Sequence, residues 1–364
     1  MQSPRLGTVL VTGGAGFIGS ALSRELAPLS DRWVVLDNLH PQIHPTRQRP
    51  DALHASAELV IGDVTSSEDW DRVLTLVKPN VVFHLAAETG TAQSLNEATR
   101  HASVNVVGTT EMLDAFSRAS HVPQHFILSS SRAVYGEGSW QRSDGSIFTP
   151  GQRTHSQLAA SQWDFAGATA LASESRRTVP APTSVYGATK LAQEHILRAW
   201  TNARDTGLTI LRLQNVYGPG QSLINSYTGI VSLFSQWARE GKTIPVYEDG
   251  HIVRDFVFID DVVSAFAAAS GRQPHEDDAP FDIGVGGQAT ILDAATFIAN
   301  YYSAPTPEIT GAFRDGDVRH ASCDIERSKA ELSWVPEWPV ERGLSALQEW
   351  IGAQIEAGEP HITS

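Results

Sequence analysis

A glycine-rich run over residues 12–19 most limits what this chain can fold into. It follows the β-branched stretch of residues 8–11 and precedes the helix-forming residues 20–26. Glycines at this spacing turn a strand into a helix against a pyrophosphate, because small residues allow close backbone approach and the helix N-terminus offers free N–H groups. The run therefore predicts a dinucleotide-binding turn whose contacts with the cofactor come from Gly13, Gly16, Phe17, Ile18 and Gly19.

One acidic residue supports this prediction and selects the cofactor. A second strand, expected over residues 33–36, ends in Asp37, about 20 residues after the glycine run. A carboxylate at this place accepts hydrogen bonds from the adenine ribose and would repel the additional phosphate of NADP. We therefore expect NAD as the cofactor, with Asp37 and Asn38 beside its ribose.

Strands and helices continue to alternate along the N-terminal half. We expect strands over residues 59–61, 81–85 and 126–128, and helices over 68–77 and 104–119. This alternation is typical of an α/β protein with a Rossmann-type, doubly wound parallel sheet, in which ligands bind at the carboxyl ends of the strands. Asp63 and Val64 follow one such strand, and Asp63 could either contact the adenine or cap the next helix.

Composition excludes several other classes of protein. The formal net charge is −14 over 364 residues, which argues against a nucleic-acid partner because phosphate backbones need clustered Lys and Arg. No apolar stretch approaches the ~20 residues of a membrane-spanning helix, so we expect no membrane partner. Cys323 is the one cysteine; it predicts a cytoplasmic protein and, with no His/Cys cluster nearby, no metal site.

The redox chemistry is predicted at Tyr186 and Lys190, which are four residues apart and share one face of a helix. A tyrosine is a poor base at neutral pH, but a nearby ammonium and a positive nicotinamide ring both favour the phenolate and lower its pKa. Lys190 would also hold the nicotinamide ribose. Ser131, just after the strand expected over residues 126–128, would bond the reacting sugar oxygen.

With these marks the chain resembles the extended short-chain dehydrogenases/reductases of the nucleotide-sugar epimerase/dehydratase family. Further marks cover nearly the whole chain in the same order: Gly62-Asp63, residues 84–87, Asn105 with Gly108-Thr109, residues 129–136, 211–221, 254–261 and 316–320. The resemblance implies that the NAD site also includes Leu85, Ala86, Ala87, Asn105 and Ser129. It further implies a smaller C-terminal α/β lobe that holds a nucleotide-diphosphate sugar.

The same resemblance suggests how the chain is divided. Residues 1–214, with a returning segment near 252–284, would form the NAD-binding domain, and residues 215–251 and 285–364 the substrate lobe. Residues 137–182 are longer than a compact relative needs there, and they read as an insert with at most one helix. This insert could be a lid over the substrate, or a surface or dimer contact. Family dimers imply a homodimer through helices 104–119 and 186–203.

Two positions narrow the reaction. Where the family's 4,6-dehydratases carry an Asp-Glu pair after the catalytic Ser/Thr, this chain has Arg132 and Ala133, so water elimination would lack its acid and base. Residues 84–91 and 214–223 look most like 4-epimerases proposed for dTDP-L-rhamnose, and UDP-glucose 4-epimerases match almost as well. We expect NAD-dependent epimerisation at C4 through a 4-keto sugar. The alternatives are a ketoreductase or dehydrogenase with net cofactor turnover, and a non-catalytic nucleotide sensor.

The residues expected to hold the substrate come from several segments. Arginine forks suit phosphate oxygens, although each arginine could equally form an ion pair, such as Arg254 with Asp255 or Arg319 with Asp317. Thr89 could face the sugar or cap a helix. The predicted substrate-binding residues are Glu88, Thr89, Ser131, Asn215, Arg254, Arg314 and Arg319.

Overall fold

The computed structural model describes residues 5–223, 229–274 and 279–358. Residues 1–4, 224–228, 275–278 and 359–364 of the expected domain segments lie outside the described part. At the centre is a sheet of seven parallel strands in the order β14-β9-β5-β4-β1-β2-β3, which confirms the predicted doubly wound α/β fold. Its strands are β1 (Thr8–Thr12), β2 (Arg32–Asp37), β3 (Ala57–Ile61), β4 (Val81–His84), β5 (His125–Ser131), β9 (Gly207–Leu213) and β14 (Phe281–Ile283).

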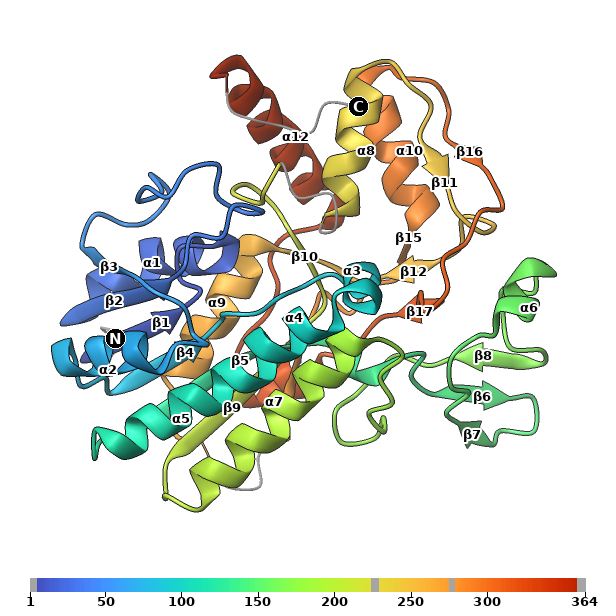
Figure 1. Cartoon of the computed structure of the whole chain (residues 1–364). Coiled ribbons are helices and arrows are strands. Elements are labelled where there is room, and N and C mark those ends of the chain that lie inside the picture. Colours follow the sequence, from blue (N-terminus) through green and yellow to red (C-terminus); the bar gives the residue numbers. More distant parts are fainter. Residues whose placement is uncertain (1–4, 224–228, 275–278, 359–364) are drawn as a thin grey trace.

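Helices cover both faces of this sheet (Figure 1). One face packs against α1 (Phe17–Leu26) and α9 (Ile259–Ser270), and the other against α2 (Ser67–Leu76), α5 (Gly108–Arg118) and α7 (Val185–Asn202). Successive strand residues point to opposite faces, so Val9 and Val11 belong to one core cluster and Leu10 to the other. Burial on both sides explains why the strands are almost continuously apolar.

The direction of chain winding reverses at β1, which lies between β2 on one side and β4 on the other. In sheets of this kind the ligand crevice lies outside the carboxyl ends of the strands at this reversal. The glycine-rich turn follows β1 and residues 85–89 follow β4, so both segments meet at the crevice.

The described part of the C-terminal lobe is built from short strands and helices, of which α8, α10 and α12 stand at the top of Figure 1. β10 pairs with β13, β11 with β16, and β12 with both β15 and β17. The bounds are β10 (Asn215–Tyr217), α8 (Ile230–Arg239), β11 (Pro245–Val246), β12 (Val253–Arg254), β13 (Phe256–Phe258), β15 (Ala289–Thr290), α10 (Ile291–Tyr302), β16 (Glu308–Ile309), β17 (His320–Ala321), α11 (Glu326–Leu332) and α12 (Val340–Glu356). In the described part, no helix is both long and apolar enough to cross a membrane.

Two regions differ from what the sequence pattern predicted. The helix expected over 104–119 consists of a π-helical turn (Ser103–Val107) followed by α5. Two further α-helices that the sequence did not predict, α3 (Thr91–Asn96) and α4 (Ala98–Ala102), precede it. The insert holds a three-stranded antiparallel sheet as well as the one helix expected there. Its strands are too short for alternation to be read from the sequence: β6 (Trp140–Arg142), β7 (Ile147–Phe148) and β8 (Ala168–Ala170), with α6 (His155–Ala159) between β7 and β8.

Candidate active site

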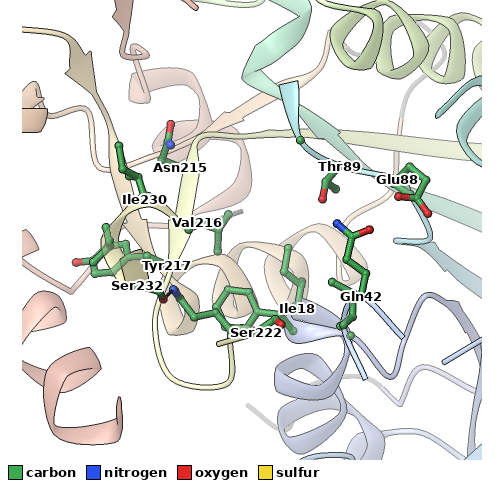
Figure 2. A pocket seen from close by; sticks show the side chains of 18 of the residues that line it. Ile18, Gln42, Glu88, Thr89, Asn215, Val216, Tyr217, Ser222, Ile230 and Ser232 are labelled. Atoms are coloured by element: carbon green, nitrogen blue, oxygen red, sulfur yellow. Dashed lines mark hydrogen bonds between the residues drawn. The ribbon is translucent and has the colours of Figure 1, made fainter. Parts of the chain in front are cut away.

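A cavity of about 750 Å³ lies over the carboxyl ends of β1, β4 and β5 and extends to the C-terminal lobe. Its walls combine the glycine-rich turn and Tyr186 with residues of β10, α8 and β12. Figure 2 shows Glu88 and Thr89 on one side and Asn215 on the other, with Ile18 and Ser222 between them. Its volume is within the usual range for sites that bind small molecules and cofactors.

The three glycines of the turn are required for different reasons. Gly13 has φ +64°, and a Cβ there would lie 2.7 Å from the Cα of Ala86; a Cβ on Gly19 would lie 2.4 Å from the Cα of Gly14. These two glycines are needed for close packing of strand and helix. A Cβ on Gly16 would meet only the Gly13 carbonyl oxygen, at 3.3 Å, and Gly16 lines the cavity. This free approach to the start of α1 fits a bound pyrophosphate, as NAD requires.

Asp37 is held beside the same turn. Its Oδ2 accepts a hydrogen bond of 3.0 Å from the Ala15 N–H and its Oδ1 one of 2.9 Å from the Leu39 N–H, while the side chain lines the cavity. His44 Nε2 lies 4.0 Å from Asp37 Oδ1, and burial lowers the pKa of this imidazole. A carboxylate oriented by backbone donors suits the ribose hydroxyls of NAD, so the residues fit the cofactor. Sequence reasoning missed His44, because its loop carries no motif.

Most of the other predicted cofactor residues reach the cavity, whereas Asp63, Asn105 and Lys190 do not. Phe17, Ile18, Asn38, Val64, Leu85, Ala86, Ala87 and Ser129 line it. The Asp63 carboxylate lies outside the lining; it accepts bonds from the Asn38 amide and from the backbone and side chain of Thr65. Asn105 is also outside the lining: its side chain bonds the Glu88 N–H and carbonyl and Thr189 Oγ1. Asn105 therefore positions the segment after β4.

Tyr186 is half-buried and lines the cavity together with Ser131. Burial raises the pKa of the Tyr186 phenol above its usual value, while the Ser131 side chain and the charge of Arg132 oppose the rise. The neighbouring cation in the protein alone is therefore Arg132, where the helix spacing predicted Lys190. The protein by itself keeps the phenol protonated, so a further positive charge is needed to favour the phenolate.

Lys190 follows Tyr186 by one turn of α7 and is buried away from the cavity lining. Burial lowers the pKa of its ammonium to about 7, and the charge of Glu194 opposes this shift. Glu194 is itself fixed, because Ser130 Oγ donates to it and Arg212 forms a two-pronged ion pair with distances of 3.0 and 2.7 Å. The order Tyr186, Lys190, Glu194 thus forms a stripe along one helix face.

Two arginines line the substrate side of the cavity: Arg254 is buried and Arg132 is half-buried. Arg132 Nε donates to Asn215 Oδ1 at 2.8 Å, and Arg254 Nη1 donates to the Val318 carbonyl at 2.8 Å; all three side chains line the cavity. Burial lowers the pKa of Arg132 to about 9, and the nearby charge of Arg254 adds to this. Two close guanidinium groups are stabilised by an anion between or beside them. Arg132 was noted in the sequence only for the acid that it replaces, so its binding role was missed.

The two remaining arginines differ in position. Arg314 is exposed at the rim of the cavity, with its guanidinium carbon 5.0 Å from the centre of the Tyr247 ring. The structure places Arg319 outside the cavity, contrary to its predicted substrate contact. Its guanidinium is held by Asp249, Asp164 and Glu248 at distances of 2.7, 2.8 and 3.1 Å, rather than by the expected Asp317. We therefore assign Arg319 a structural role.

Glu88 and Thr89 both line the cavity beyond the end of β4. The Glu88 carboxylate is paired with Arg100 at 2.8 Å, and Arg100 also donates to the Gln42 side chain at 2.9 Å. The Thr89 carbonyl bonds the His101 ring, which lies in a T-shaped arrangement with the Tyr186 ring, with ring centroids 6.5 Å apart. Both residues stay candidates for contact with a sugar, and Arg100 is a neighbour that the sequence did not reveal.

Comparison with known proteins agrees with this geometry. Residues 9–286 match the model of the NAD dependent epimerase/dehydratase family. A dTDP-L-rhamnose 4-epimerase of Burkholderia thailandensis is 60% identical over 96% of each chain. A UDP-glucose 4-epimerase of Thermotoga maritima, solved with UDP-glucose, superposes with a TM-score of 0.79 at 28% identity, covering 96% of this chain and 99% of that one. MoeE5, solved with UDP-glucuronic acid and NAD, has a TM-score of 0.74 at 27% identity, covering 96% and 100%.

Proposed function

The chain belongs to the NAD dependent epimerase/dehydratase family, and we propose that it inverts C4 of a nucleotide-diphosphate deoxyhexose of the dTDP-L-rhamnose class. Family membership confirms the prediction of an NAD-dependent enzyme. The 60% identity to a dTDP-L-rhamnose 4-epimerase supports this sugar class over the UDP-hexoses, for which the relatives are more distant.

One observation carries the proposal: a single cavity is lined both by the reactive pair Tyr186 and Ser131 and by the arginines Arg132 and Arg254. A sugar whose diphosphate lies on the arginines can extend toward the phenol. Asn215 Oδ1 accepts from Arg132, so the Nδ2 group is the part of this amide that can donate to a ligand. Arg314, stacked on Tyr247, would add a cation at the rim.

The residues act in sequence on the sugar C4 hydroxyl. Ser131 bonds this oxygen and orients it toward Tyr186, whose phenol oxygen takes the proton and later returns it. Bound NAD would take the C4 hydride and give it back to the other face, and its positive ring would favour the phenolate. Between these steps the 4-keto sugar turns while Arg132, Asn215 and Arg254 keep hold of the diphosphate. Lys190 lies outside the cavity lining in the protein alone, one turn of α7 from Tyr186, and it would contact the nicotinamide ribose from there.

Arg132 also argues against elimination of water. Its guanidinium stays protonated and is engaged with Asn215, so it cannot take a proton from C5 as a carboxylate would. Net oxidation or reduction remains the second candidate function, because Tyr186 and Ser131 would serve a dehydrogenase or ketoreductase in the same way.

Turnover without added cofactor tests the proposal. Purified protein would be incubated with dTDP-L-rhamnose, UDP-glucose or UDP-galactose, with products identified by NMR and NADH followed by absorbance. We expect a C4 epimer of equal mass from dTDP-L-rhamnose, with no accumulation of NADH. Stoichiometric consumption of added NAD(H) would support a dehydrogenase or reductase function instead. An epimer formed only from the UDP-hexoses would show that the substrate belongs to that sugar class.

The proposal includes the division of the chain and its assembly. We assign residues 1–214 with 252–284 to NAD binding, and 215–251 with 285–364 to the substrate. We further propose a cytoplasmic homodimer that pairs α5 and α7, supported by the exposed Val107 at the start of α5. Sedimentation equilibrium would give twice the chain mass, and a monomer would remove this part of the proposal.

A further inference from the structure

The insert contains a buried cation that the reaction does not use. Arg153 is 1% exposed, and its guanidinium is bound by Glu137 at 3.0 Å and by Glu248 at 2.9 Å. Glu137 opens the insert, whereas Glu248 belongs to the turn after β11 in the C-terminal lobe. An arginine with so little exposure is retained only where its donors are matched by acceptors. This ion cluster therefore fastens the insert to the lobe at a defined place.

The same cluster holds the backbone of residues 317–319. Arg153 Nη2 donates to the Asp317 carbonyl at 2.9 Å, and the Arg319 N–H donates to Glu137 Oε2 at 2.9 Å. Both contacts come from the insert, one at each end of this three-residue segment. Gly316 and Asp317 line the substrate cavity.

The opposite side of that segment orients Arg254. The Val318 carbonyl accepts from Arg254 Nη1 at 2.8 Å, and Asp317 Oδ1 lies 3.6 Å from Arg254 Nη2. The chain of contacts thus runs from Arg153 through residues 317–318 to a guanidinium that faces the cavity. A small displacement of this segment would move the Arg254 guanidinium. Misplacement of a substrate-positioning group by about 1 Å can greatly lower the rate of a reaction.

We propose that the insert is part of the substrate site: Arg153 is a positioning residue that sets the Arg254 guanidinium for the diphosphate of the substrate. This inference rests on the proposed function, since it needs a nucleoside diphosphate at Arg254. In this proposal the insert is not a lid but a fixed support for residues 317–319. Cofactor binding, on the opposite wall of the cavity, does not depend on this support.

The test compares three variants of the full-length, NAD-bound enzyme. Arg153→Lys keeps the charge but loses the guanidinium group, whose several N–H donors contact Glu137, Glu248 and the Asp317 carbonyl together. Arg254→Lys alters the binding group directly. Arg142→Lys is the matched control, because Arg142 belongs to the same insert but stacks on Phe148 within its hairpin. Binding of dTDP is measured by calorimetry, with kcat, KM and NAD content beside it.

We expect Arg153→Lys to weaken dTDP binding and raise KM by about tenfold, with kcat within about twofold and NAD content unchanged. Arg142→Lys should match the wild type. A purely structural Arg153 would lower the melting temperature while leaving dTDP affinity unchanged in the folded variant, and that result would overturn the proposal. Should Arg153→Lys not fold, Glu137→Gln keeps the shape of the side chain and must show the same selective loss, to a smaller extent.

The two proposals fail in different ways. If the wild type bound no dTDP or UDP, the proposed function would be wrong. If the wild type bound dTDP and Arg254→Lys weakened it, but Arg153→Lys and Glu137→Gln did not, then only the positioning role would be wrong.

Discussion

The cofactor wall of the cavity is built from neighbouring residues, whereas the substrate wall is assembled from distant ones. Gly13, Gly16 and Asp37 lie within two consecutive strand–turn units, and their backbone contacts hold them in place. Arg132 and Arg254 come from separate segments, and Arg254 is set by contacts that include an insert. The first wall can be recognised from spacing alone, while the second depends on tertiary contacts.

The carboxylates near the cations of the two walls also differ in how far apart they lie in the sequence. Lys190 lies in a single helix, and Glu194 is the carboxylate whose charge opposes the effect of burial. Arg254 is influenced by the carboxylates of Asp317, Glu137 and Glu248, which come from three segments. Burial lowers the pKa of both Lys190 and Arg254, but one carboxylate opposes this shift at Lys190 and three oppose it at Arg254. Three predictions use this contrast.

The largest effect is expected at Tyr186, where the two walls meet. Tyr186→Phe removes the group that exchanges a proton with the C4 hydroxyl, and general acid–base groups contribute about 10²–10⁴-fold to rate. We expect kcat to fall by that factor with NAD content and dTDP affinity unchanged, measured by turnover, absorbance and calorimetry. Tyr301→Phe, at an exposed tyrosine of α10, is the control. Full activity of Tyr186→Phe would refute the mechanism.

An intermediate effect is expected in the glycine-rich turn. Gly13→Ala adds a Cβ at φ +64° and 2.7 Å from Ala86, combining about 1–2 kcal/mol for the left-handed backbone with about 1–3 kcal/mol for overpacking. Gly145→Ala in the insert has φ +85° but no atom within 4 Å, so only the backbone cost applies.

Urea unfolding and NAD content separate the two variants. Gly13→Ala should lose more stability than Gly145→Ala and should also lose NAD, because the collision moves the turn at the pyrophosphate. Equal losses of stability, with NAD retained in both, would mean that the packing of Gly13 against Ala86 does not hold the cofactor wall.

The sequence was sufficient for features that depend on local spacing. The glycine turn, Asp37 and the pair Tyr186–Lys190 could all be placed because a strand–turn–helix unit or a single helix brings their parts together. The parallel sheet followed from the alternation of strands and helices. These are properties of short, continuous stretches.

Features that depend on tertiary contact could not be read in this way. The partners of Arg319 were assigned to its neighbour Asp317, but the guanidinium meets Asp164 of the insert and Asp249 of the lobe. The cation whose charge lowers the Tyr186 pKa was assigned to Lys190 from helix spacing, but Arg132, which directly follows β5, has this effect in the protein alone. In both cases the interacting charge comes from a different segment than the sequence spacing suggested.

The smallest of the three effects is expected in the pH dependence of the free energy of unfolding, through the titration of Lys190. Burial lowers the pKa of Lys190 from 10.5 to about 7 in the folded protein. Between these values the unfolded chain carries a proton that the folded chain lacks, so the free energy of unfolding rises with pH by about 1.4 kcal/mol per pH unit. Below about pH 7 both states are protonated and the contribution is constant.

Lys190→Met removes this titration while keeping an unbranched side chain. The difference in free energy of unfolding, wild type minus Lys190→Met, should therefore increase between pH 8 and 9 by about 1.4 kcal/mol, in urea titrations at a fixed NAD concentration. Parallel curves would show that Lys190 keeps its charge over this range. The charge on the cofactor wall would then be as well supported as that of Arg254, and the contrast between the two walls would rest on geometry alone.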